Sequence, residues 1–285
     1  MPHREDILYV VATPIGNLND ITIRALEVLR SVDTVLTENV PKTRVMLRHH
    51  GITARIASYR EENAARMGEV ALGILRAGRP VALVAEAGTP GVSDPGRRLV
   101  DAAWKGGFRV VPVPGASAAV AAVSVSGMED GRFVFEGFLP RKRSRRRQRL
   151  ADLAAEERAL VFFEAPHRLV ECLEDIKHAL GDRACVVARE ITKLHEEIDK
   201  GPVSSFLARF AEREPRGEFV VVCEGRSPAA GAAPAESAGL EAAVREAAEL
   251  VSGGLKKKLA AKTVAKRYDL DSSEIYRRLT RGGST

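Results

Sequence analysis

The chain has 285 residues, of which 45% are hydrophobic and 29% are charged, with a formal net charge of +6. This length suffices for two hydrophobic cores, and the composition is that of a globular protein rather than a disordered or fibrous one. No run of about 18 apolar residues and no leader pattern is found, so we expect a cytoplasmic protein without a signal peptide or membrane span. Cys172, Cys185 and Cys223 lack CxxC spacing, which predicts buried, reduced thiols and no metal site.

Short apolar runs alternate with helical patterns in the first part of the chain. The alternation predicts an α/β domain with mostly parallel strands over residues 1–127. Expected strands are 7–12, 34–36, 55–58, 81–85 and 109–113. Helices are expected from residue 23, from residue 41, and at 63–77, 96–105 and 117–126.

A second α/β series follows over residues 128–225. Its expected strands are 133–136, 159–163, 185–189 and 219–223, and its expected helices are 146–156, 166–180 and 203–212. Residues 226–239 are almost entirely Ala, Gly, Pro and Ser, a composition typical of a flexible linker. Residues 240–285 read as a basic helical tail. Its outline is that of a helix-turn-helix, with one helix at 263–268 and a capped start at 271–274, although a helical hairpin packed on the body fits the same residues.

The positive charge is concentrated in two segments. Residues 141–149 hold seven cations in nine positions, which is more than the net charge of +6 of the whole chain. Residues 255–285 hold nine Lys and Arg against three acids. Two cationic arms on an acidic body predict a polyanionic partner, although a solvated helix face would show the same run.

Three predicted strands of the first domain end in loops that contain glycine and proline, at residues 13–17, 86–96 and 112–118. The carboxyl ends of parallel strands meet at one edge of a sheet, where glycine allows backbone to approach a ligand closely. Glycine and proline also end strands in ordinary turns, but three such loops in one sheet favour a ligand site. Neither GxGxxG after the first strand nor GxxxxGK[ST] is present, so the sequence does not favour ATP or NAD.

Several ordered segments resemble one family. They are Val-Ala-Thr-Pro-Ile-Gly-Asn-Leu at 11–18, Ala-Gly-Thr-Pro-Gly-Val-Ser-Asp-Pro-Gly at 87–96, Pro-Gly-Ala-Ser-Ala at 114–118, Phe-Glu-Gly-Phe-Leu-Pro-Arg at 135–141 and Glu-Ala-Pro-His-Arg at 164–168. Together they resemble the tetrapyrrole methylase superfamily, and more narrowly its ribosomal RNA small subunit methyltransferase I branch. The likeness runs from about Ile7 to Glu224, and the tail is similar to the appendage of that branch. Two departures are Glu86, where Asp is usual, and Glu38-Asn39-Val40, where Glu-Asp-Thr is usual.

The resemblance implies two α/β domains of the tetrapyrrole methylase type with a cofactor cleft between them, plus a small C-terminal helical region. It also implies a homodimer that methylates a cytidine ribose 2′-hydroxyl in the decoding region of 16S rRNA, using S-adenosylmethionine. The implied cofactor contacts in the first domain are Pro14, Glu86, Gly88, Thr89, Ser93, Asp94, Pro114, Gly115, Ser117 and Ala118. In the second domain they are Phe163, Ala165, Arg189 and Val221.

Methyl transfer from a sulfonium needs chiefly in-line positioning of the acceptor oxygen and no metal, with a side chain to help remove the hydroxyl proton. Candidate bases are Glu38, Glu164, His167, Glu190, Lys193 and His195, each of which could instead cap a helix or pair with a neighbour. Arg44 and Arg168 are candidates for phosphate or ribose contact. We expect an RNA backbone to lie along Arg141, Lys142, Arg143, Arg145, Arg146 and Arg147.

Two other functions fit parts of the sequence. A methylase acting on a corrin or porphyrin precursor would share the fold and the cofactor, but has no need of the basic arms. An RNA-binding or assembly protein without catalytic activity would explain the arms, but leaves the three strand-end loops without a ligand.

Overall fold

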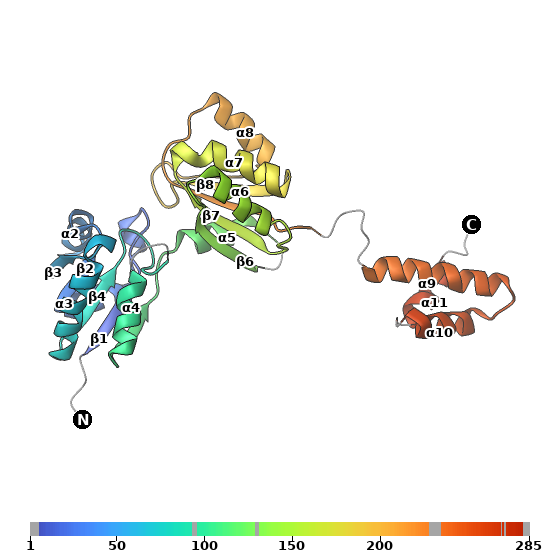
Figure 1. Ribbon diagram of the computed structural model, residues 1–285, viewed down its shortest axis with the longest axis horizontal. Coiled ribbons are helices and arrows are strands. Elements are labelled where there is room, and N and C mark those ends of the chain that lie inside the picture. The colour runs from blue at the N-terminus through green and yellow to red at the C-terminus, as the bar shows by residue number, and fades with distance from the viewer. Residues whose placement is uncertain are drawn as a thin grey trace. The chain divides into compact units, whose positions relative to one another are not determined.

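The computed structural model describes residues 6–92, 96–128, 131–227, 235–268, 270 and 272–281 (Figure 1). The chain divides into two compact units, Met1–Gly225 and Arg226–Thr285. The larger unit contains two five-stranded sheets, and the smaller unit is helical. Among the described residues, no helix is both long and apolar enough to cross a bilayer.

The first sheet is parallel throughout, as predicted. Its strands are β1 (Ile7–Val11), β2 (Thr34–Thr37), β3 (Arg55–Ser58), β4 (Val81–Val84) and β5 (Arg109–Val113). They lie in the order β3-β2-β4-β1-β5. Because all five run in the same direction, the loops that follow β1, β4 and β5 leave the sheet at one edge.

Helices cover both faces of this sheet. They are η1 (Leu18–Asp20), α1 (Ile23–Ser31), α2 (Val40–His49), η2 (Glu61–Asn63), α3 (Ala64–Arg76) and α4 (Gly96–Lys105). Leu8 and Leu83 pack with α3 and α4, whereas Val11 and Val84 pack with α1 and α2. Alternate residues of a strand point to opposite faces, so strands buried on both sides are apolar throughout.

The second sheet is mixed. Its strands are β6 (Phe133–Phe138), β7 (Ala159–Glu164), β8 (Ala184–Arg189), β9 (Glu197–Pro202) and β10 (Phe219–Cys223), in the order β6-β7-β10-β8-β9. Only β6 and β7 pair in parallel, and the other three pairings are antiparallel. The sequence indicated strands in this domain but not their directions, because a short buried apolar run does not encode strand direction.

The edge strand β9 was not predicted. Its sequence, Glu-Ile-Asp-Lys-Gly-Pro, is charged and ends in two residues that disfavour strands, and its side chains alternate between half-buried and exposed. It pairs only with β8. Edge strands are commonly charged because this discourages pairing with other chains, so the apolar pattern used to find strands misses them.

Four helices pack on the second sheet: α5 (Ala118–Ser126), α6 (Arg143–Asp152), α7 (Pro166–Leu180) and α8 (Val203–Glu212). α5 lies on one face, where Ala119 and Ala122 contact alternate residues of β7, β8 and β10. α6, α7 and α8 cover the opposite face. Cys172, Cys185 and Cys223 are buried here with free thiols, as predicted.

The smaller unit contains α9 (Ala235–Ser252), α10 (Lys257–Tyr268) and α11 (Ser272–Arg281), which share a core built largely of alanine. The predicted linker 226–239 is wrong from Ala235 onward, because the alanines that make the segment resemble a linker also favour a helix. Residues 228–234 and the predicted cap at Asp271 lie outside the described residues.

Candidate functional site

The three glycine-containing loops of the first domain are joined by hydrogen bonds. Thr13 and Gly88 form a two-way backbone bridge, in which the Thr13 N–H donates to the Gly88 carbonyl at 2.9 Å and the Gly88 N–H donates back at 3.1 Å. The Ala12 N–H donates to the Val113 carbonyl at 3.1 Å. The Thr89 hydroxyl donates to the Ala116 carbonyl at 3.3 Å. The structure therefore brings together the loops that the sequence singled out.

Two glycines allow these loops to approach each other. Gly88 has a φ of +78°, a left-handed conformation that disfavours other residues. A Cβ on Gly115 would lie 2.9 Å from the Cβ of Ala12. Ser117 caps α5 by accepting a hydrogen bond from the Val120 N–H. Pro114 and Gly115 are exposed, and the Pro114 carbonyl accepts a hydrogen bond from the Thr22 hydroxyl at 3.5 Å.

The remaining predicted contacts of these loops differ in accessibility. Pro14 is buried, Thr89 and Ala118 are half-buried, and Glu86 is exposed. Ser93 and Asp94 lie outside the described residues.

Glu86 is held by α2. Its carboxylate accepts a hydrogen bond from the Lys42 ammonium at 2.6 Å, and this bond, which outweighs partial burial, holds the pKa of Glu86 below its ordinary value. Asn39, which replaces the usual Asp, accepts a hydrogen bond from the Lys42 N–H and caps α2. Glu38 is half-buried, and its carbonyl accepts a hydrogen bond from the Arg60 guanidinium. Arg44 lies exposed on α2.

A loop of the second domain, residues 190–196, contacts the first of the glycine loops. The Asn17 N–H donates to the Thr192 hydroxyl at 3.1 Å. A Cβ on Gly16 would lie 2.4 Å from the Cγ of Lys193, so this contact requires glycine. Glu190 and Thr192 have φ angles of 51° and 68°. Left-handed backbone in residues other than glycine costs energy and is concentrated at functional sites.

Glu190 and Lys193, two of the candidate bases, are bound to each other. The Lys193 ammonium donates to the carboxylates of Glu190 and Glu218, each at 2.8 Å. The Glu218 N–H also donates to Glu190. Burial raises the pKa of Glu190 and lowers that of Lys193, but these hydrogen bonds outweigh it, so the pKa of Glu190 falls and that of Lys193 rises. The lowered pKa makes Glu190 a weaker base, and the raised pKa keeps Lys193 protonated, so both are better suited to positioning than to proton abstraction.

Glu164 and Arg168 form a buried ion pair at the start of α7, with 3.3 Å between their nitrogen and oxygen. Glu164 is 2% exposed. Arg168 also donates to the Leu139 carbonyl at 2.8 Å. Both residues are thus occupied in holding the loop before α6 against α7. His167 and His195 are exposed.

The predicted second-domain cofactor contacts lie on the adjacent strands β7, β10 and β8 and just before α7, but they differ in accessibility. Phe163 is half-buried and stacks edge to face with Phe135 and Phe138, and Ala165 is half-buried. Val221 is fully buried in the core with α7, and β10 is paired on both sides, so neither its side chain nor its backbone is available to a ligand. We therefore leave Val221 out of the cofactor contacts proposed below.

The arginine run on α6 is largely paired within the protein. Asp175 of α7 is fully buried and accepts hydrogen bonds from Arg143, Arg146 and Arg147 at 3.2, 2.8 and 2.7 Å. We call these four residues the Asp175 cluster. Arg146 is only 1% exposed, so we leave it out of the proposed RNA contacts. Arg141, Lys142 and Arg145 are exposed and form no ion pair with any described residue.

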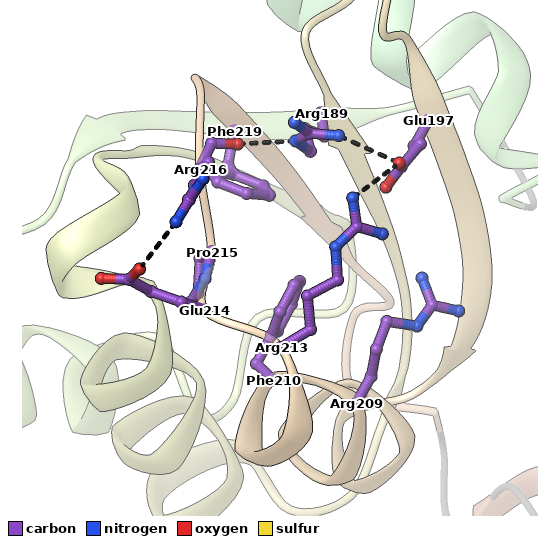
Figure 2. A pocket seen from close by; sticks show the side chains of 9 residues that line it. All are labelled: Arg189, Glu197, Arg209, Phe210, Arg213, Glu214, Pro215, Arg216 and Phe219. Carbon is purple, nitrogen blue, oxygen red and sulfur yellow. Dashed lines mark hydrogen bonds and ion pairs between the residues drawn. The ribbon is translucent and has the colours of Figure 1, made fainter.

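A separate group of arginines surrounds a hollow on the second domain, which sequence reasoning did not find (Figure 2). The hollow has a volume of about 280 Å³ and adjoins a second of about 500 Å³. We call the two together the Arg189 hollow. Its ionisable lining residues are Arg189, His195, Glu196, Glu197, Arg209, Arg213, Glu214 and Arg216. Among the described residues, no group of three or more His, Cys, Asp or Glu side chains is placed to hold a metal ion.

A model of the tetrapyrrole (corrin/porphyrin) methylases matches residues 7–207. The chain belongs to this family. It is 42% identical over 271 residues to the ribosomal RNA small subunit methyltransferase I of Synechocystis sp., covering 95% of this chain and 96% of that protein. Its identity to the protein of the same name from Thermotoga maritima is 47% over 219 residues, or 77% of this chain and 98% of that one. The branch that the sequence segments indicated is thereby confirmed.

Solved structures with low identity share the fold. A cobalt precorrin-4 methyltransferase has a TM-score of 0.60 at 17% identity, covering 79% of this chain and 97% of that chain. The methyltransferase CobJ has a TM-score of 0.59 at 20% identity, covering 78% and 96%. The predicted fold class, with two α/β domains of the tetrapyrrole methylase type and a small helical region, is confirmed.

Proposed function

We propose that the chain transfers a methyl group from S-adenosylmethionine to the ribose 2′-hydroxyl of a cytidine in the decoding region of 16S rRNA. The observation that carries this proposal is the 42% identity, over 95% of the chain, to a ribosomal RNA small subunit methyltransferase I. The family match and the exposed cations on α6 support it as well. A ribosomal substrate would place the protein in the cytoplasm.

The first-domain loops fit the proposed cofactor. The bridge between Thr13 and Gly88 and the close approach of Gly115 to Ala12 leave a surface of backbone and small residues, against which an amphipathic ligand can lie closely. We propose that Pro14, Glu86, Gly88, Thr89, Ser93, Asp94, Pro114, Gly115, Ser117 and Ala118 hold it, together with Phe163 and Ala165 from the second domain. Arg189 is bound to the Arg216 carbonyl and to Glu197 and lines the Arg189 hollow, so we leave it out of the proposed cofactor contacts.

S-adenosylmethionine supplies a methyl group that its sulfonium already activates for attack. The protein's task is to hold the acceptor oxygen in line, and such positioning is worth roughly 7 to 11 kcal/mol at best. The contact of Asn17 with Thr192 supports a positioning role for residues 190–196, because it fixes this loop against the first-domain loop that contains Pro14. Lys193, held by Glu190 and Glu218, would orient the acceptor through its fixed positive charge.

Of the candidate bases, His167 and His195 are the most accessible, whereas Glu164, Glu190 and Lys193 are occupied by ion pairs. We propose that one of the two imidazoles accepts the hydroxyl proton. Replacing each with Asn and measuring kcat distinguishes them, since loss of a general base lowers kcat by roughly 10²- to 10⁴-fold. Equal kcat values in both variants and the wild type would assign proton removal to solvent.

The decisive experiment uses labelled S-adenosylmethionine and small ribosomal subunits from a strain that lacks the enzyme. We expect one labelled cytidine ribose in the decoding region, detected by mapping of the modified nucleotide. Label on a tetrapyrrole and never on RNA would replace the proposal with the corrin or porphyrin alternative. Failure of the purified protein to bind the donor in calorimetry would leave only an RNA-binding module.

We further propose a homodimer. Val120 and Val125 of α5 are more than half exposed, and burial of such side chains favours association. Analytical ultracentrifugation of the full chain should give twice the mass of 30.8 kDa. A single species at the monomer mass of 30.8 kDa would contradict the dimer.

A further inference from the structure

We propose that the Arg189 hollow is a phosphate-binding subsite for the RNA backbone, separate from the first-domain loops and from α6. This inference rests on the proposed RNA substrate and adds a place where that substrate is bound. It is drawn from four arginines, their partners and the position of the hollow beside residues 190–196.

The deeper part of the hollow is lined by more positive than negative side chains. Arg189, Arg209, Arg213 and Arg216 face it. Glu197 and Glu214 among the lining residues, together with Asp199, which pairs with Arg209 at 2.5 Å, balance three of these four charges. Four different segments supply this lining: the end of β8, the start of β9, the end of α8 and the turn before β10 (Figure 2). The fold therefore converges positive charge at a concave site, which is the arrangement that concentrates anions.

Arg189 forms the fixed wall of the hollow. Its Nε donates to the Arg216 carbonyl at 2.6 Å and one terminal nitrogen donates to Glu197 at 3.0 Å, while the side chain is only 16% exposed. The other terminal nitrogen has no hydrogen-bond partner among the described residues. A held guanidinium with a donor to spare is pre-organised for a phosphate oxygen.

Arg213 and Arg216 are the exposed donors. Arg213 shares Glu197 with Arg189 at a longer distance of 3.4 Å, so one carboxylate serves two guanidiniums. Arg216 pairs with Glu214 at 3.5 Å, and both side chains are about 80% exposed. Exposed pairs of this kind contribute little, so both arginines can turn onto a phosphate at small cost.

The position of the hollow links it to the proposed reaction. Leu194, His195 and Glu196 line its outer part, and they belong to the loop whose Thr192 accepts a hydrogen bond from the Asn17 N–H. A phosphate in the hollow would therefore lie beside the loop that contacts the first-domain ligand loops. The edges of Phe210 and Phe219, which stack edge to face, form an apolar floor that strengthens charge interactions above it.

The test compares three variants of the full chain. R213Q/R216Q removes the exposed donors, R213K/R216K keeps their charge without the forked geometry, and R66Q/R76Q removes two exposed arginines of α3 as the charge-matched control. Binding of a fluorescent decoding-region RNA is measured by anisotropy from low to high salt. Donor binding is measured separately by calorimetry.

For R213Q/R216Q we expect about tenfold weaker RNA binding and a shallower salt dependence. The log–log slope should fall by roughly 0.7 for each single-strand phosphate that the variant can no longer bind. R213K/R216K should recover the wild-type salt slope but only part of the wild-type affinity for RNA. The control should match wild type, and donor binding should be unchanged in all variants.

The outcomes separate this proposal from the proposed function. Equal RNA affinity and slope in R213Q/R216Q and R66Q/R76Q would overturn the subsite, even if wild type methylates the small subunit. Loss of RNA binding in R213Q/R216Q alone would support the subsite, even if wild type transfers no methyl group to the subunit. A thermal shift with inorganic phosphate that requires Arg213, without any RNA effect, would overturn it in favour of a small-anion site.

Discussion

The Asp175 cluster and the Arg189 hollow lie in the same domain and use the same side chain in opposite ways. In the cluster, a fully buried carboxylate gathers three guanidiniums and fastens α6 to α7. In the hollow, four guanidiniums share a few exposed carboxylates around an open space. The difference teaches that burial of the acidic partner, more than the density of arginine, decides whether a basic group serves the fold or remains available to an RNA.

The largest effect should come from removing the acid at the centre of the cluster. D175N removes the buried partner of Arg146 and leaves only the exposed Glu171, at 3.1 Å, to pair with it; breaking a buried pair costs about 3 to 5 kcal/mol. E174Q on the same helix is the matched control, because Glu174 is half exposed and pairs only with Arg143 among the described residues. Its cost should stay within about 0.5 kcal/mol. Urea denaturation followed by circular dichroism measures both, and equal midpoints would show that the cluster does not hold α6.

The cluster should also make stability depend on pH. Burial raises the pKa of Asp175, but hydrogen bonds from Arg147, Arg146 and Arg143 outweigh it and hold that pKa below the ordinary 3.8. A carboxyl with a lowered folded-state pKa contributes stability above its unfolded pKa and loses it as the pH falls through the folded value. The free-energy difference between wild type and D175N should therefore be constant above about pH 5 and shrink below pH 3.8. A difference that persists unchanged into that acidic range would contradict the assignment.

The sequence predicted the strand-end loops well because glycine and proline mark local geometry, and a parallel sheet gathers the ends of its strands. It also contained a signal for the cluster that we did not use. Arg146 lies one turn before the buried Leu150, and Asp175 lies between Cys172 and Ile176 on the apolar stripe of α7. A charged residue inside each of two facing stripes indicates a buried pair.

The hollow could not be foreseen in the same way. Arg209, Arg213 and Arg216 are brought to Arg189 by the strand β9, whose charged sequence shows no apolar alternation. The short segment Arg-Glu-Pro-Arg at 213–216 also mixes signs, so no run of positive charge marks it. Sites assembled from several segments around an edge strand depend on the tertiary fold, which local patterns do not specify.

A moderate effect should separate the two kinds of basic residue in and just before α6. R141Q/K142Q/R145Q removes exposed cations without a carboxylate partner among the described residues, and we expect roughly 3- to 10-fold weaker rRNA binding with a flatter salt dependence. R147Q removes a member of the cluster and should instead lower stability, with a smaller change in the salt slope. Anisotropy titrations over a range of salt concentrations, with urea denaturation of the same proteins, measure both properties. Unchanged RNA binding in the triple variant would remove α6 from the RNA interface.

The smallest effects should come from two single ion pairs. One has a nearly buried carboxylate and the other an exposed one, so they test directly whether burial of the acid commits an arginine to the fold. Arg149 grips Glu136 through two hydrogen bonds of 2.8 and 2.7 Å, and Glu136 is only 11% exposed. A double-mutant cycle with R149Q and E136Q should give a coupling of about 1 kcal/mol. The cycle with R216Q and E214Q should give about 0.2 kcal/mol or less, because that pair is exposed on both sides. A strong Arg216–Glu214 coupling would mean that Arg216 is committed to the fold, and so could not turn onto a phosphate in the hollow.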